Sequence, residues 1–332
     1  MTSKPIVIFG ETLIDDFLDQ PVVGGAPFNV ARTLGYFDCD PLMISRVGDD
    51  TTAALIRADM QRFKLQTSGL QTDTQHPTGR VKVTQEDSSD KTRHHFEILS
   101  NQAYDYIDAQ MATQAMQAGC PLHNQGIFYF GTLAQRNQTS RAALYKLLQQ
   151  TSAIKYLDLN LRAMQFSLAS IEQSLEYADI VKLNEEELQI LAEIYLNQIK
   201  PDAPHQSVEA ELEEHATALI KLFGLQAILT TLGERGYVYV DKASHCLRSA
   251  AEPIKIQVAD TVGAGDAFSA IFLLGMQRNW PLAITLQRAH EFAAAICSVR
   301  GAVASDLGFY AQWQQRWHAE IPDVTNPGGV NQ

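Results

Sequence analysis

The segment ADTVGAGDAFSA, at residues 259–270, places three small residues and an acid at the start of an apolar run. The small residues are Gly263, Ala264 and Gly265, and the acid is Asp266. A tight turn or a helix cap would explain either feature alone. Small residues at a helix N-terminus also leave backbone N–H groups open to phosphate, and a carboxylate beside phosphate can take a proton from an attacking hydroxyl. We therefore interpret the segment as an anion site with a general base.

The composition limits the partners that such a site would serve. The chain has 332 residues, 45% of them hydrophobic, and a formal net charge of −12. This charge disfavours nucleic acid, which is bound by clustered Lys and Arg. Four cysteines without a CxxC pair indicate neither a zinc site nor a disulfide framework. Because we find no signal peptide and no membrane-spanning stretch, we expect a cytoplasmic protein with neither a membrane nor a nucleic-acid partner.

Apolar runs typical of buried strands alternate with helical patterns along the chain. This alternation predicts an α/β fold with a mostly parallel sheet covered by helices. The expected strands are residues 6–10, 41–45, 126–130, 154–159, 180–183 and 227–232. The segment of about 68–98 is typical instead of a hairpin around the polar turn EDSSDK. With residues 16–24, it is expected to form a small β lid over the carboxyl edge of the sheet.

Polar residues and glycines follow several of these expected strands. They are Asp15, Gly24, Gly25, Asn29, Asp158, Asn160, Arg162, Asn184, Glu187, Thr231, Gly233 and Gly236. Simpler explanations exist for most: a turn at the first glycine pair, a capping box in NEEE, and a hairpin turn in TTLGERG. All of them, however, lie at the expected carboxyl edge of the sheet, where doubly wound sheets bind ligands. Their shared position favours a binding site.

These motifs resemble the PfkB, or ribokinase-like, carbohydrate kinases over nearly the whole chain. The resemblance rests on GGAPFNVARTLG, SRVGDD and DTVGAGDAF, with DLNLR, KLNEEE and TLGERG between them. It implies one ribokinase-like kinase domain over residues 1–332, a three-layer α/β/α sandwich with the lid segments inserted in it. It also implies a small-molecule sugar substrate, ATP and Mg²⁺ as cofactors, and a homodimer formed through the β lid.

The resemblance further implies a role for each site residue. Asp266 is the catalytic base, and the amides of Gly263, Ala264 and Gly265 form an anion hole for the transferring phosphoryl group. The sugar is bound by Asp15, Gly25, Asn29 and Arg162. The nucleotide is bound by Asn184, Thr231, Gly233 and Gly236, and Glu187 organises Mg²⁺ through water.

A potassium ion beside the anion hole is also implied by the resemblance. Its ligands would be mainly backbone carbonyls, at Asp260, Val262, Ile296, Val299, Gly301 and Ser305. The cation would add positive potential near the phosphoryl group, at a place where we expect the protein to offer no Lys. Asp260 has a simpler explanation, as the cap of the turn.

Within the family, GETLIDD and GGAPFNVA are most similar to fructokinases, whose pattern is GEALID followed by GGAPANVA. The acid Asp15 would repel a sugar carboxylate, so we expect a neutral sugar, fructose, to be converted to fructose 6-phosphate. Alternative substrates are ribose, ketodeoxygluconate or a nucleoside, and the alternative outside enzymes is a sugar-binding sensor with weak catalysis. Three features depart from the fructokinase pattern: Phe28 stands where it has a small residue, GDDTTAAL lacks a Gly, and FEILSNQAYD lacks an Arg.

Other enzyme classes lack their motifs in this sequence. There is no GxxxxGK[ST], which disfavours a P-loop kinase, and no GxGxxG after the first expected strand, which disfavours a dinucleotide-dependent oxidoreductase. There is also no HExxH, and the pair His94-His95 would point to opposite faces of a strand, which makes a metal site there improbable.

Overall fold

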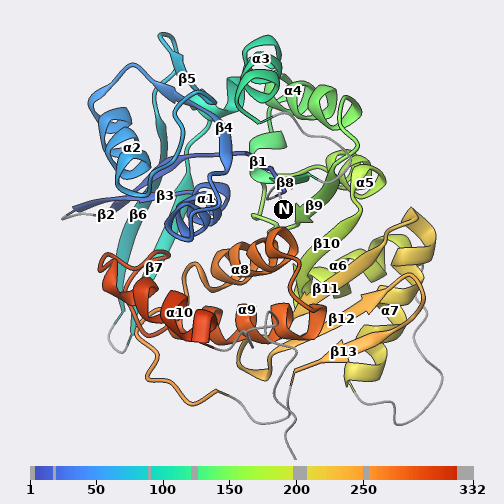
Figure 1. The fold of residues 1–332 in the computed structure, drawn as a ribbon. Coiled ribbons are helices and arrows are strands. Elements are labelled where there is room, and N and C mark those ends of the chain that lie inside the picture. Colours follow the sequence, from blue (N-terminus) through green and yellow to red (C-terminus); the bar gives the residue numbers. More distant parts are fainter. Residues whose placement is uncertain are drawn as a thin grey trace, which may run out of the picture.

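A nine-stranded sheet lies at the centre of the computed structural model, which describes residues 4–17, 20–88, 91–120, 126–196, 208–249 and 254–319 (Figure 1). The strand order is β13-β12-β11-β10-β9-β8-β1-β4-β5. The strands are β1 (Ile6–Phe9), β4 (Leu42–Gly48), β5 (Leu70–Asp73), β8 (Ile127–Gly131), β9 (Ile154–Asp158), β10 (Ile180–Asn184), β11 (Ala227–Thr231), β12 (Tyr237–Asp241) and β13 (Cys246–Arg248). Pairing is parallel from β11 to β5, and only β12 and β13 are antiparallel among these strands. The six strands expected from the sequence are therefore confirmed.

Helices cover both faces of this sheet, because its strands are apolar on both sides. In β1, Ile6 and Ile8 pack with one hydrophobic core, while Val7 and Phe9 pack with the other. The first core is closed by α1 (Ala26–Tyr36), α2 (Thr51–Arg62), α8 (Ala264–Arg278), α9 (Leu282–Ile296) and α10 (Gly308–Ala319). The second is closed by α3 (Ala109–Gly119), α4 (Gln138–Gln149), α5 (Leu168–Tyr177), α6 (Glu185–Tyr195) and α7 (Val208–Phe223). The three-layer α/β/α sandwich is confirmed.

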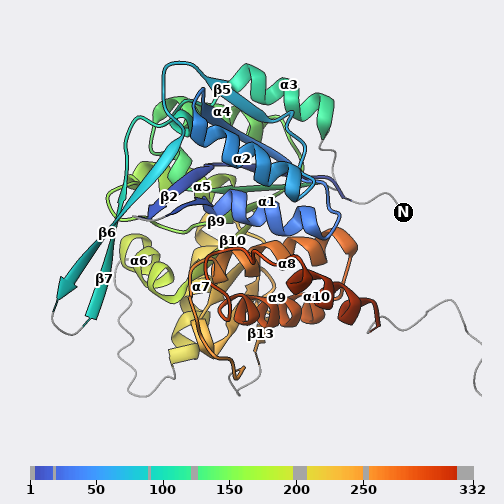
Figure 2. The same cartoon turned by 90° about the vertical axis from the view of Figure 1, so that its left-hand side faces the viewer.

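A second sheet, of four strands, stands apart from the first. Its order is β3-β2-β6-β7, with β2 (Leu13–Phe17), β3 (Gln20–Gly24), β6 (Gly79–Ser88) and β7 (Lys91–Ile98). The β6–β7 hairpin extends beyond the body of the molecule in Figure 2. Two boundaries differ from the expected lid segments. The sheet begins at Leu13 instead of residue 16, and residues 70–73 belong to the large sheet because β5 pairs in parallel with β4. Residues 89–90 of the hairpin turn lie outside the described part.

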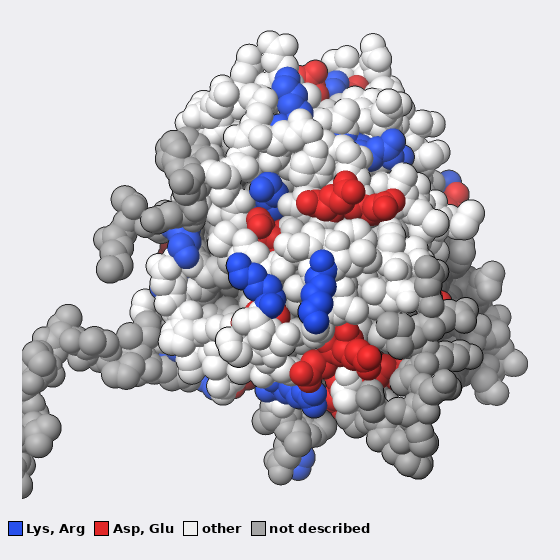
Figure 3. Space-filling view, turned by 90° about the vertical axis from the view of Figure 1, so that its right-hand side faces the viewer, with Lys and Arg blue, Asp and Glu red and all other residues white. Residues whose placement is uncertain are grey.

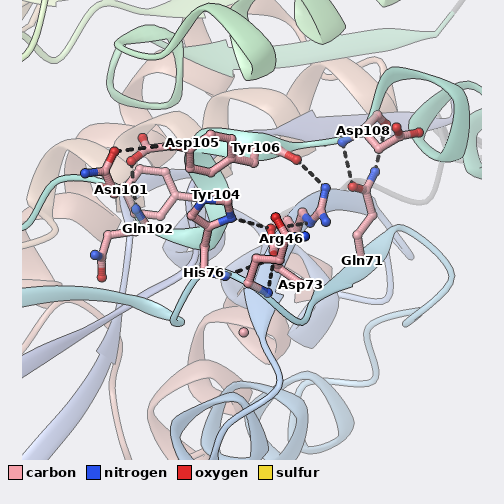
Figure 4. A network of polar contacts seen from close by, with 12 residues as sticks. Arg46, Gln71, Asp73, His76, Asn101, Gln102, Tyr104, Asp105, Tyr106 and Asp108 are labelled. Carbon is pink, nitrogen blue, oxygen red and sulfur yellow. Dashed lines mark hydrogen bonds and ion pairs between the residues drawn. The ribbon is translucent and has the colours of Figure 1, made fainter.

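A polar network fixes the loop that connects β5 of the large sheet to β6 of the second sheet (Figure 4). Asp73 Oδ2, at the end of β5, lies 3.0 Å from Arg46 Nε and 3.1 Å from His76 Nδ1. Arg46 also donates to the carbonyl of Tyr106, at 2.6 Å, and the rings of His76 and Tyr106 stack at 3.7 Å. The connection from β5 to β6 is thereby fixed against the short 3-10 helix η1 (Ala103–Tyr106).

Asp50 of the SRVGDD motif joins the same two sheets at another point. Its carboxylate caps α2 through the amide of Ala53 and accepts hydrogen bonds from the amide and hydroxyl of Thr78, at the start of β6. Partial burial alone would raise the pKa of Asp50, but hydrogen bonds from Thr52 and Thr78 lower it to about 2. The motif therefore has a structural role between β4, α2 and the lid.

Charged side chains of both signs are mixed on one face of the molecule. In Figure 3, Lys and Arg side chains are scattered among Asp and Glu, and no continuous basic patch forms on the described part of that face. No helix in the described ranges is both long and apolar enough to cross a lipid bilayer.

Candidate active site

The first turn of α8 and the first turn of α1 meet at a hydrogen bond between Asp266 and Asn29. The Nδ2 atom of Asn29 donates to Oδ2 of Asp266 at 2.7 Å, although the two residues are 237 positions apart in the sequence. Asn29 is buried and Asp266 is half-buried. The structure therefore brings the expected base and an expected sugar ligand together.

The N-terminus of α8 depends on a glycine. Gly263 is the N-cap residue and has a φ of 81°, in the left-handed region. A Cβ at this position would lie 2.4 Å from the Cα of Ala302, so a side chain is excluded by space as well as by conformation. The amide of Ala264 donates to the carbonyl of Thr261 at 3.3 Å. One of the three amides expected in the anion hole is thus directed back into its own loop.

A buried lysine lies beneath this helix N-terminus, which corrects the expectation that no Lys is near. Lys182 Nζ is 2.8 Å from the position that a Cβ on Gly265 would occupy. It pairs with the buried carboxylate of Asp158, at 3.0 and 3.2 Å, and that carboxylate also accepts hydrogen bonds from Ser269 and Tyr129. The sequence did not reveal this ammonium because Lys182 stands inside the apolar strand β10. The ammonium lies beside the expected anion hole, but its charge is matched there by the carboxylate of Asp158.

Three acidic side chains lie on the side of the site where the sugar is expected, within the electrostatic influence of Arg162. Burial raises the pKa of Glu11 to about 7 and of Asp15 to about 6, while the charge of Arg162 lowers both. Burial likewise raises the pKa of Asp266 to about 6, against the hydrogen bond from Asn29. Glu11 is 4% exposed, and its Oε2 atom has no hydrogen-bond partner among the described residues. Glu11 is not among the site residues expected from the sequence.

The glycine pair between β3 and α1 makes room for these carboxyl groups. A Cβ on Gly24 would lie 2.4 Å from Asp15 Oδ2, and a Cβ on Gly25 would lie 2.7 Å from the carbonyl oxygen of Glu11. Gly25 also has a φ of 104°. The pair is therefore required both for the turn and for the close approach of Asp15 and Glu11.

The NEEE segment forms the capping box that was one of its two interpretations. Asn184 caps α6 by accepting from the amide of Glu187, and Glu187 Oε2 accepts from the amide of Asn184, both at 2.8 Å. Glu187 Oε1 accepts from the amide of Leu161 at 2.6 Å. Each carboxylate oxygen thus already holds one backbone N–H group and keeps a further lone pair.

This arrangement fits an indirect contact of Glu187 with Mg²⁺, through water, better than direct ligation. Among the described residues, no group of three or more His, Cys, Asp or Glu side chains is placed to hold a metal ion. Burial raises the pKa of Glu187, although the hydrogen bonds from the Asn184 and Leu161 amides oppose the rise.

The TLGERG segment forms the hairpin connection expected for it, from β11 to β12. Gly233 begins the 3-10 helix η3 (Gly233–Arg235) with a φ of 61°. Gly236 has a φ of 94°, and a Cβ there would overlap the side chain of Ser249. The hydroxyl of Thr231 donates to the carbonyl of Leu183, at 3.3 Å, which ties the end of β11 to β10.

The segments expected to hold a monovalent cation lie side by side. Asp260 accepts from the amide of Val262, at 3.0 Å, and from the amide of Gly301, at 3.1 Å, so it does cap the turn. The carbonyl of Ile296 accepts from the amide of Val299, and the carbonyl of Ser305 accepts from Arg62. The loop before α8 and the loop after α9 are therefore joined, and two of the expected carbonyls, those of Ile296 and Ser305, are already hydrogen-bonded.

The chain is similar to known carbohydrate kinases in sequence and in fold. Residues 19–307 match the model of the pfkB family carbohydrate kinases. Fructokinase-1 of Oryza sativa subsp. japonica is 25% identical over 329 residues, with 91% of this chain and 92% of that protein covered. A fructokinase from Vibrio cholerae O395, solved with fructose, ADP and calcium bound, superposes with a TM-score of 0.73 at 21% identity and covers 93% of this chain and 98% of its own. An aminoimidazole riboside kinase from Salmonella enterica, solved with aminoimidazole riboside and an ATP analogue, has a TM-score of 0.72 at 20% identity and covers 94% of this chain and 99% of its own.

The Lys182–Asp158 pair leads to a prediction about stability. Lys182→Met leaves the carboxylate of Asp158 buried without its counter-charge, so the free energy of unfolding should fall by about 3 kcal/mol. The double variant Lys182→Met/Asp158→Asn removes both charges and should recover at least half of that loss. Urea unfolding of the single and double variants measures both values. Strict additivity of the two substitutions would contradict a direct pairing.

Proposed function

The chain belongs to the pfkB family of carbohydrate kinases, and we propose that it transfers the γ-phosphoryl group of ATP to a hydroxyl of fructose, giving fructose 6-phosphate. The observation that carries this proposal is the 2.7 Å hydrogen bond between Asn29 and Asp266. It places an amide suited to a sugar hydroxyl beside a carboxylate at a helix N-terminus. One group thus binds the acceptor and the other activates it.

In the proposed reaction, Asp266 acts as the general base. The attacking hydroxyl oxygen forms a bond to the γ-phosphorus, its proton passes to the Asp266 carboxylate, and the bond from phosphorus to the ADP oxygen breaks. A pKa of about 6 makes Asp266 a stronger base than an ordinary aspartate while leaving it ionised at neutral pH. The raised pKa therefore suits the role.

Stabilisation of the phosphoryl group is assigned to the N-terminus of α8. The helix dipole and the amides at this end favour negative charge, and the ammonium of Lys182, paired with Asp158, lies beneath Gly265. Mg²⁺, carried mainly by the ATP phosphates and reached from Glu187 through water, would neutralise further charge. Asn184, Thr231, Gly233 and Gly236 are proposed to line the nucleotide side.

The acidic surroundings of the sugar side support a neutral acceptor. Arg162 lowers the pKa of Glu11, Asp15 and Asp266, but it supplies one positive charge against three carboxyl groups. A sugar acid would bring one more negative charge to this group. A neutral sugar is therefore preferred to ketodeoxygluconate, and fructose is preferred because the motifs of this chain are most similar to fructokinases.

Location and assembly are part of the same proposal. Use of ATP suits a cytoplasmic enzyme. The lid sheet has β3 and β7 at its edges, and Val22 of β3 is 40% exposed, which is consistent with a homodimer formed through the lid. Light scattering of the purified protein would measure the oligomeric state.

A substrate panel tests the proposed sugar. Fructose, ribose, ketodeoxygluconate and a nucleoside are each incubated with Mg-ATP, and ADP release is followed in a coupled assay. We expect the highest kcat/KM for fructose. Phosphorylation of another sugar would replace fructose within the same reaction, whereas sugar binding without ADP release would favour the sensor alternative.

Neighbouring acids on β2 provide a matched pair of variants for the sugar site. Asp15 packs against Gly24, while Asp16 points to the other face of the strand and pairs with Arg80 at 3.5 Å. Asp15→Ala should raise KM for fructose about tenfold or more, since a hydrogen bond to a charged group contributes about 1.5–3 kcal/mol. Asp16→Ala should leave KM within about twofold of wild type. Equal effects of the two substitutions would remove Asp15 from the sugar site.

Substitution of the base should separate catalysis from binding. Asp266→Asn cannot accept the proton, and kcat should fall by about 10²–10⁴-fold. The affinity for ATP, measured by calorimetry, should remain close to that of wild type because the N-terminus of α8 is retained. In the wild type, kcat/KM should decrease as pH falls through about 6, where Asp266 becomes protonated. A variant that keeps more than about a tenth of kcat would contradict the assignment.

Potassium activation is the remaining part of the proposal. The hydrogen bond from the Gly301 amide to Asp260 holds the two loops together beside α8, which supports a cation site there. A cation bound between these loops would order the start of α8. We expect kcat to increase when KCl is added to enzyme in tetramethylammonium buffer, and to increase less with NaCl at equal ionic strength. Equal kcat in potassium and in tetramethylammonium would exclude the site and leave the role of Asp266 unaffected.

A further inference from the structure

Asn29 is held on its far side by a buried arginine. Arg32 lies one turn further along α1 and is 5% exposed. Its Nη2 atom donates to Asn29 Oδ1 at 2.5 Å and to the carbonyl of Val23 at 2.9 Å. Its Nη1 atom pairs with Asp59 Oδ2 at 2.5 Å. A continuous chain of contacts thus runs from Asp59 on α2, through Arg32 and Asn29, to Asp266 on α8.

The chemistry of this chain allows only one orientation of the Asn29 amide. An arginine side chain has only hydrogen-bond donors, so the Asn29 oxygen must face Arg32. The amide nitrogen is then left to face Asp266, whose ionised carboxylate has only acceptors. We propose that Arg32 is a positioning residue for catalysis, which fixes the Asn29 amide so that it donates a hydrogen bond to Asp266. This inference rests on the proposed role of Asp266 as base.

Arg32 is itself held from several directions. Its guanidinium lies 5.1 Å from the ring centroid of Phe28 and 5.9 Å from that of Phe63. Both rings are buried in the core between the sheet and the first helical layer. Phe28, the large residue that departs from the fructokinase pattern, therefore supports Arg32 instead of entering the sugar site. Three ring or carboxylate partners and the Val23 carbonyl leave the guanidinium little freedom to move.

Loss of Arg32 would release the amide. Once Asn29 can rotate, its oxygen can face Asp266, and that arrangement requires a protonated carboxyl group as donor. The fixed orientation consequently favours the ionised form of Asp266. Other charged groups also act on Asp266, and they remain in place in an Arg32 variant. They are Asp158, Lys182 and Arg162, and Glu11. Those that act on Arg32 are Asp59, Tyr310 and Asp266 itself, with Asp15 nearby.

The test compares Arg32→Met, Arg32→Lys and Asp59→Asn. Arg32→Met keeps most of the side-chain length but has no donor, so the acid limb of kcat/KM against pH should move up by about one unit, which is tenfold in the protonation equilibrium. Arg32→Lys keeps a cation that can only donate hydrogen bonds. The acid limb of its kcat/KM profile should therefore lie between those of Arg32→Met and wild type. Asp59→Asn removes the ion pair while its amide oxygen still accepts from Arg32, so its limb should coincide with that of wild type. A limb that stays in place in Arg32→Met, or moves equally in Asp59→Asn, would overturn the proposal.

A second measurement does not depend on activity. The carboxyl carbon of Asp266, identified in ¹³C-aspartate-labelled protein by its absence in Asp266→Asn, is titrated by NMR in wild type and in Arg32→Met without substrate. Because the charge of Arg32 also acts directly on Asp266, the substitution is repeated in Asn29→Ala, which has no amide to orient. An upward shift that is larger with Asn29 present than in Asn29→Ala supports the positioning role even if the wild type fails to phosphorylate any sugar, and equal shifts, or none, refute it. Should Arg32→Met fail to fold, Arg32→Gln replaces it, because glutamine offers both a donor and an acceptor and lets the amide turn.

Discussion

The hydrogen bond between Asn29 and Asp266 is the constraint on which the rest of the site depends. It joins the first helix of the chain to α8, and both helices lie on the same face of the large sheet. For it to form, α1 must begin directly after the glycine pair of β3, and α8 must begin at a left-handed glycine, Gly263. The two glycine turns are thus consequences of one requirement, that two helix N-termini converge on a single point.

The carboxyl groups of this site are partly destabilised by their burial. Burial raises the pKa of Glu11, Asp15 and Asp266, so each ionised group costs free energy in the folded state. A carboxyl group whose pKa is raised in the folded state contributes less to stability as the pH increases. The contribution falls between the ordinary pKa of the group and its raised pKa. The fold therefore accepts a loss of stability at neutral pH in order to keep these three carboxyl groups, a pattern common to active sites.

The sequence predicted the elements of this site better than the contacts between them. Strand positions followed from apolar runs, and the glycine-rich start of α8 followed from its local residue types. Lys182 was missed because its strand reads as buried apolar sequence, and only the packing of β10 against α8 brings its ammonium to Gly265. Phe28 was interpreted as a departure within the sugar motif, although its ring packs in the core below Arg32. Contacts of this kind depend on side-chain directions that no local pattern encodes.

From the sequence, a capping role and a ligand-binding role are alternative interpretations of the same motif, but the two roles are compatible in the structure. Asn184 and Glu187 form a capping box, and the same hydrogen bonds fix the Glu187 carboxylate at the N-terminus of α6 with lone pairs still available. Asp260 caps a turn and in doing so joins the two loops beside α8. Helix and strand ends are where backbone groups lack partners, so residues that satisfy them are necessarily held rigidly at the ligand-binding edge of the sheet. A cap at that edge is therefore already positioned for a second role in binding.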